Sequence, residues 1–81
     1  MSDKISKALA QFSLQDKQLI NQLLLLIKRN DLIGLDVSRL KGHKDIYRLR
    51  KGRIRIIYQA KNGQINILEI GRRSEKTYRN Y

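Results

Sequence analysis

The stretch Asp45–Ile70, DIYRLRKGRIRIIYQAKNGQINILEI, decides the fold. It is rich in isoleucine, tyrosine and leucine that alternate with polar residues, the pattern of half-buried strands. Lys51-Gly52 and Asn62-Gly63 interrupt the alternation, and Asn-Gly is the strongest short signal for a β-hairpin. The sequence therefore predicts a three-stranded antiparallel meander with strands at 45–50, 53–60 and 64–70.

The register of this meander predicts two unlike faces. With a two-residue loop at Lys51-Gly52, Arg50 opposes Arg53 and Arg48 opposes Arg55, above a floor of Ile46, Ile57 and Leu68. We expect the other face to pack on helices, with Glu69 near its end as a structural carboxylate. That apolar face holds Tyr47, Leu49, Ile54, Ile56, Tyr58, Ile65 and Ile67.

Upstream, apolar residues recur at helical spacing in two runs, from Ile5 to Phe12 and from Ile20 to Ile27. Ser13, with Asp16 three residues later, is typical of a helix N-terminus, and Asn30 marks the end of the second run. We interpret 32–40 as a packed connector, with Asp31 and Asp36 as turn residues. The prediction is an α+β fold in a single domain, 1–81, with two N-terminal helices on one face of a small antiparallel sheet.

Charge narrows the class of partner. The 81 residues include 18 Lys+Arg against 7 Asp+Glu, a formal net charge of +11. Residues 39–81 hold 13 of the basic side chains and 3 of the acidic ones, so the second half carries almost all of the excess. This balance favours nucleic acid or an acidic protein as the partner.

Other site classes find little support. The chain has no cysteine, no metal-ligand spacing and no glycine-rich phosphate loop, so we expect neither a metal nor a cofactor. His43 reads as a surface loop residue. The longest apolar run, 23–27, is far too short to span a bilayer, and no secretory h-region follows the N-terminus. We expect a cytoplasmic protein that does not contact the membrane.

The default interpretation of a basic sheet face is that it is simply the solvated side. Like charges directly opposite across strands are destabilising, however, so two facing arginine pairs favour an anionic ligand. Arginine also grips phosphate in bidentate fashion. The C-terminal segment adds basic residues interleaved with tyrosines, a pattern that can hold a phosphate backbone while stacking a base; these are Arg72, Arg73, Lys76, Arg79, Tyr78 and Tyr81. Tyr78 could instead be a packing residue, and Tyr81 a frayed terminus.

The connector GLDVSRLKG at 34–42 and the segment DIYRLRKGRIRIIYQAKNGQINILEIGRRSEKTY at 45–78 resemble the RelE/ParE toxin superfamily of bacterial toxin–antitoxin systems, most closely its RelE-like mRNA interferases. The resemblance implies a small α+β toxin that cuts mRNA without a metal, typically in the ribosomal A site. It also implies an acidic antitoxin that wraps the toxin and silences it.

The resemblance also implies which residues are catalytic and which bind RNA. It assigns catalysis to Arg48, Arg50, Arg55, Arg73 and Tyr78, with Arg72 and Tyr81 as alternative matches for the last two. We expect further RNA contacts from Lys51, Arg53, Arg72, Lys76 and Tyr81.

Two departures from the family matter. The family opens with a short strand before the first helix, so the sheet has four strands if that strand exists and three otherwise. RelE itself has lysines at the positions of Arg48 and Arg50, and an arginine does not exchange protons in proteins. We therefore expect Arg48 and Arg50 to stabilise the transition state, Arg55 and Arg73 to hold the phosphate, and Tyr78 to act on the 2′-OH. The alternatives are a non-catalytic ParE-like gyrase inhibitor or a basic RNA-binding module.

Overall fold

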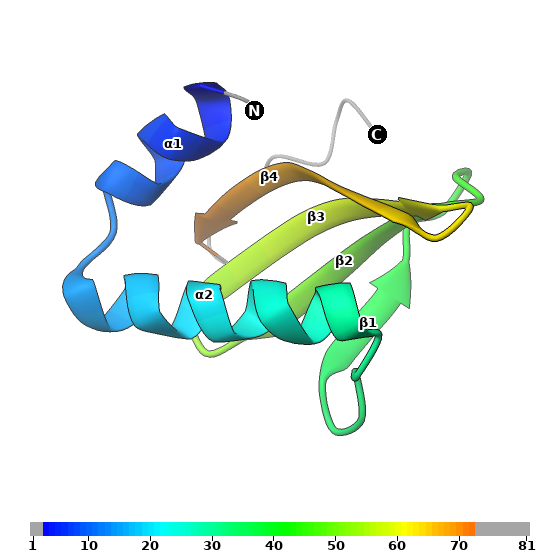
Figure 1. The fold of residues 1–81 in the computed structure, drawn as a ribbon, viewed down its shortest axis with the longest axis horizontal. Coiled ribbons are helices and arrows are strands. Elements are labelled where there is room, and N and C mark those ends of the chain that lie inside the picture. Colours follow the sequence, from blue (N-terminus) through cyan, green and yellow to red (C-terminus); the bar gives the residue numbers. More distant parts are fainter. Residues whose placement is uncertain (1–2, 73–81) are drawn as a thin grey trace.

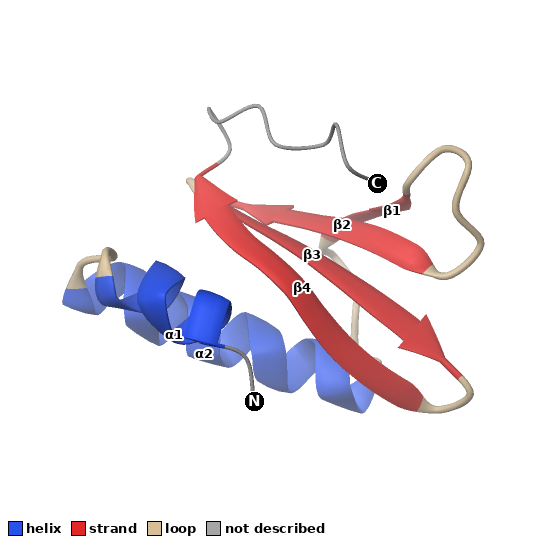
Figure 2. Ribbon diagram, turned by 90° about the horizontal axis from the view of Figure 1, so that it is seen from above, coloured by secondary structure: helices blue, strands red, loops and turns tan. Residues whose placement is uncertain are grey.

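Two helices and a four-stranded sheet make up residues 3–72, the part of the chain that the computed structural model describes. The helices are α1 (Asp3–Ala10) and α2 (Leu14–Arg29), and the strands are β1 (Asp36–Arg39), β2 (Ile46–Lys51), β3 (Ile54–Lys61) and β4 (Gln64–Arg72). The strands run antiparallel in the order β1-β2-β3-β4 (Figure 1). Both helices lie on one face of the sheet (Figure 2). The predicted α+β class is confirmed.

Local signals define both ends of α2. The hydroxyl of Ser13 accepts a hydrogen bond from the backbone N–H of Asp16 at 3.1 Å, as an N-cap does. At the other end Asn30 adopts a left-handed conformation with φ 57°, and its N–H is bonded to Ile27 and Leu26 carbonyls. Both ends match the sequence prediction. Neither helix within residues 3–72 is long and apolar enough to cross a bilayer.

The fourth strand, β1, corrects the expectation for the connector. It forms inside the stretch read as a packed loop and pairs with β2, so Asp36 is a strand residue. The additional strand therefore follows α2, whereas the family resemblance placed one ahead of the first helix; α1 is the first element among the described residues. Val37, a β-branched residue, packs against the core from this edge strand.

The hairpin between β2 and β3 turns one residue later than expected. Its loop is Gly52-Arg53, with Gly52 at φ 56°, because glycine accepts positive φ without steric cost at the first loop position. The resulting register pairs Leu49 with Ile56 and Tyr47 with Tyr58. The predicted Asn62-Gly63 turn is present, with both residues at positive φ.

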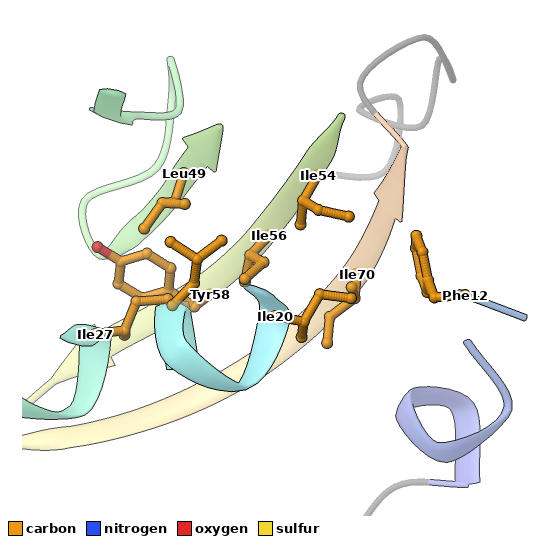
Figure 3. Packing of buried hydrophobic residues seen from close by; sticks show 9 residues of the cluster. Phe12, Ile20, Ile27, Leu49, Ile54, Ile56, Tyr58 and Ile70 are labelled. Carbon is orange, nitrogen blue, oxygen red and sulfur yellow. The ribbon is translucent and has the colours of Figure 1, made fainter. Parts of the chain in front are cut away.

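The core lies between α2 and the sheet, as Figure 3 shows. Tyr47 stacks on Tyr58, with ring centroids 5.6 Å apart. Burial raises the pKa of the Tyr58 phenol above its ordinary value, and Tyr47 adds to the shift. The buried cluster is Phe12, Ile20, Leu23, Ile27, Leu49, Ile54, Ile56, Tyr58 and Ile70, with Tyr47, Ile65 and Ile67 packed against it. The predicted apolar face is thus confirmed.

Candidate functional site

The sheet face opposite the helices carries Arg48, Arg50 and Arg55, and we call it the arginine face. Leu49 and Ile56 belong to the core beside the helices, so their sequence neighbours on β2 and β3 point the other way. Two cross-strand rows of paired residues, running from β1 to β4, make up its centre. The first row is Asp36, Arg50, Arg55 and Gly71, and the second is Ser38, Arg48, Ile57 and Glu69.

The edge strand β1 supplies partners for the two arginines of β2. Asp36 pairs directly with Arg50 in the sheet register, and Asp36 Oδ2 accepts from Arg50 Nε at 3.0 Å and from Nη2 at 2.9 Å. Arg48 Nη2 donates to Ser38 Oγ at 3.0 Å, again from the directly opposite position. Arg50 remains 33% exposed. The strand that sequence reasoning missed therefore holds both side chains.

A carboxylate from β4 meets the arginine of β3. The register shifts between Ile57 and Tyr58, where Ile57 pairs with Glu69 and Tyr58 pairs with Ile67. Leu68 is the extra residue of this bulge, and it turns Glu69 onto the arginine face. Glu69 Oε2 then lies 3.2 Å from Arg55 Nη2. The expectation that Glu69 lies on the core face is wrong, because simple alternation from Ile65 does not survive the bulge.

The later turn also corrects the predicted arginine pairs. Arg50 faces Arg55, and Arg48 faces Ile57, so one directly opposed pair replaces the two that were expected. Arg53 leaves the arginine face altogether. It lies in the loop, 81% exposed, and its Nη2 is 4.0 Å from Asp16 Oδ2 on α2.

Two other predicted RNA-binding residues also point away from the arginine face. Lys51 alternates in phase with Leu49, on the helix side of β2, and is exposed. Arg72 pairs with Ile54 of the core face. Its guanidinium donates to the Gln11 carbonyl at 3.3 Å and lies 4.9 Å from the Phe12 ring centroid. Arg72 therefore fastens the end of β4 to the turn between the helices.

The described residues do not include four predicted site residues, Arg73, Lys76, Tyr78 and Tyr81. The structure brings together Arg48, Arg50 and Arg55, and separates Lys51, Arg53 and Arg72 from them. In the part of the chain that is described, no group of three His, Asp or Glu side chains is placed to hold a metal ion.

Within residues 3–72, positive charge exceeds negative charge on the arginine face. Its centre has three guanidinium groups and two carboxylates there, and the carboxylates lie on the flanking strands β1 and β4. Arg55 is fully buried, whereas Arg50 is the more accessible cation. Of these two arginines, Arg50 is therefore the one that an anionic group from solvent can reach directly.

A second concave feature lies on the helix side. It lies between α2 and the first half of β4, beyond the part of β4 that α1 contacts. The groove there has a volume of about 490 Å³ and is lined by Leu24, Lys28, Gly63, Ile65 and Ile67. Lys61 lines its continuation toward the β3–β4 hairpin. Its floor is apolar and its charged rim is cationic.

The same architecture is found in a solved structure of an antitoxin-toxin complex. A chain from the crystal structure of the RelB-RelE antitoxin-toxin complex from Methanococcus jannaschii matches with a TM-score of 0.73, over 89% of this chain and 87% of that chain. The likeness is one of fold. Sequence identity is 22%, and the sequence matches no protein-family model and no curated protein.

Sequence reasoning missed Asp36 and Ser38 as parts of the site. Their signal was present in Asp36–Arg39, where polar residues at 36 and 38 alternate with Val37. Four residues between a turn and a loop are too few for that alternation to stand out from a connector. The role of Glu69 had no such signal, since a bulge does not alter composition.

Proposed function

We propose that this chain is the toxin of a bacterial type II toxin–antitoxin system, a metal-independent endoribonuclease that cleaves mRNA in the ribosomal A site. The observation that carries the proposal is the gathering of Arg48, Arg50 and Arg55, from two adjacent strands, on one face of the sheet. The shared fold with a chain of an antitoxin–toxin complex supports it, as does the sequence resemblance.

The chemistry that we propose is internal transfer within RNA. The 2′-oxygen attacks the adjacent phosphorus after losing its proton, and the bond from phosphorus to the 5′-oxygen breaks. The products are a 2′,3′-cyclic phosphate and a 5′-hydroxyl, which takes up a proton. Arg48 and Arg50 stabilise the additional negative charge at phosphorus by preorganised electrostatics. Arg55 supports them from the interior, Arg73 holds the phosphate, and Tyr78 acts as base or aligner of the 2′-OH.

Charge favours the toxin over the antitoxin as the role of this chain. The family resemblance implies that the antitoxin is the acidic partner, and this chain carries a net charge of +11. The groove beside α2 fits an acidic segment with apolar side chains, because Leu24, Ile65 and Ile67 form its floor and Lys28 stands at its rim. We propose the cognate antitoxin as its occupant.

A non-catalytic binder is the second candidate, and one observation favours it. Asp36 and Glu69 each contact an arginine, so part of the positive charge is neutralised within the sheet itself. A gyrase inhibitor of the ParE type, or a basic RNA-binding module, requires no accessible catalytic arginine.

Induced expression separates these candidates. If the chain is an mRNA interferase, new mRNA 5′ ends accumulate within minutes, inside translated reading frames and in phase with codons. A gyrase inhibitor instead induces the DNA-damage response and leaves messages intact. A basic RNA-binding module produces neither result.

A further inference from the structure

Each carboxylate of the arginine face is placed by its own backbone feature. Asp36 reaches its position because β1 pairs in the register that sets it directly opposite Arg50. Glu69 reaches its position because the bulge at Leu68 reverses the alternation of β4. Bulges commonly re-aim a side chain next to a functional site. Two independent features of the backbone thus deliver one carboxylate to each end of the opposed arginine pair.

The two carboxylate contacts orient the guanidinium groups of Arg50 and Arg55 and also neutralise part of their charge. Arg50 is held along one edge of its guanidinium plane, by Nε and Nη2 together, and the rigid fork of donors then sets where Nη1 points. Arg55 is held at Nη2, within a fully buried environment. Arg50 and Arg55 stand directly opposite each other, so without the carboxylates their mutual repulsion would drive the guanidinium groups apart.

We propose that Asp36 and Glu69 are positioning residues, which hold Arg50 and Arg55 in the geometry that stabilises the transition state of RNA cleavage. This inference rests on the proposed function and adds two residues to it. The competing explanation is that the carboxylates only reduce the positive charge of the face.

The two explanations differ in their kinetic signature. Replacing Glu69 by glutamine removes one negative charge, and the neutral amide oxygen holds the Arg55 guanidinium far more weakly than the carboxylate does. The added positive charge strengthens phosphate binding under both explanations, so KM falls or stays the same. Only a positioning residue also lowers kcat, because a displaced guanidinium no longer matches the transition state.

The test compares Glu69→Gln and Asp36→Asn with the wild-type protein and with Asp45→Asn. Asp45 accepts from Gln59 and forms no ion pair with an arginine of residues 3–72, so Asp45→Asn makes the same charge change without disturbing either pair. Cleavage of a message on stalled, translating ribosomes gives kcat and KM. Circular dichroism and thermal unfolding establish that each variant is folded.

We expect kcat to fall by tenfold or more in Glu69→Gln and Asp36→Asn, without a rise in KM, and to stay at the wild-type value in Asp45→Asn. An unchanged or higher kcat in both folded variants overturns the positioning role while leaving the proposed nuclease in place. A wild-type protein that cleaves no message contradicts the proposed function and the positioning role with it. If Glu69→Gln does not fold, Asp36→Asn decides alone, since Asp36 is 53% exposed.

Discussion

Glu69 Oε2 lies 3.2 Å from Arg55 Nη2, and the guanidinium that it contacts is fully buried on the sheet face opposite the helices. A buried charge is costly unless it is paired, so this contact stabilises the arginine that β3 carries among its isoleucines. The Arg55–Glu69 pair also links β3 to β4, beside the position where Arg55 faces Arg50 across the sheet. Fold stability and the candidate site therefore depend on the same carboxylate.

The first prediction concerns the stability that this pair contributes. Glu69→Ala removes one partner of the buried Arg55, and we expect the free energy of unfolding to fall by about 1–3 kcal/mol. Asp36→Ala removes the partner of the more exposed Arg50, and should cost about 0–1 kcal/mol. Urea denaturation of both variants measures the difference. Equal, small losses would show that the buried pair contributes no more than a surface pair.

The second prediction concerns alkaline pH. Burial, with a further contribution from Tyr47, raises the pKa of Tyr58 in the folded protein above its value of about 10 in the unfolded chain. The neutral phenol is therefore favoured by folding. Its contribution is fully present below the unfolded pKa and is lost as pH rises through the folded one.

Tyr58→Phe removes this titration. Above pH 10, we expect the wild type to lose stability more steeply than Tyr58→Phe, and the two slopes to coincide between pH 7 and 9. Thermal unfolding across this range measures both slopes. Parallel slopes throughout would contradict the assignment to Tyr58.

The third prediction concerns the start of α2. Ser13→Ala removes the acceptor for the Asp16 N–H, which should lower the free energy of unfolding by about 0.5–2 kcal/mol. Ser13→Asp keeps an acceptor and adds a negative charge at the helix N-terminus, so it should retain most of the wild-type stability. Denaturant midpoints of the two variants test this order, and the reverse order would be inconsistent with capping by Ser13.

Residues with strong local preferences were predictable from sequence, and residues placed by the sheet were not. Ser13, Asn30 and Asn62-Gly63 each act through their own backbone, so their positions follow from residue type. Gly52 could serve at either loop position, and the choice depends on which register packs Leu49 and Tyr47 best. This shift of the turn by one residue determines whether Arg55 faces Arg48 or Arg50.

The bulge at Leu68 shows the same limit. Alternation predicts a face only while the ladder is regular, and one extra residue reverses every assignment beyond it. Ile70 joins the core and Glu69 joins the arginine face for this reason. The grouping of Arg48, Arg50 and Arg55 was predictable, because these arginines lie on the regular β2–β3 ladder. The carboxylate partners of Arg50 and Arg55 come from the edge strand and from the bulge.

The fourth prediction concerns the groove beside α2. Lys28 is exposed at its rim, so Lys28→Glu should repel an acidic antitoxin without altering the fold. We expect the affinity of the Lys28→Glu variant for the antitoxin to fall by about tenfold, largely because association is slower. Lys44→Glu, in the loop before β2, makes the same charge change away from the groove and serves as the control. Equal effects of the two substitutions would place the antitoxin elsewhere.

The most direct test of the central claim is mRNA cleavage by the purified protein on translating ribosomes, comparing wild type with Arg50→Gln. Arg39→Gln, at an exposed position of β1, removes the same charge and serves as the control. We predict codon-phased cleavage by the wild type and by Arg39→Gln, and a loss of about a hundredfold or more in Arg50→Gln, because one preorganised donor to a developing oxyanion contributes that much. Cleavage by folded Arg50→Gln at the wild-type rate would contradict the assignment of the arginine face as the active site.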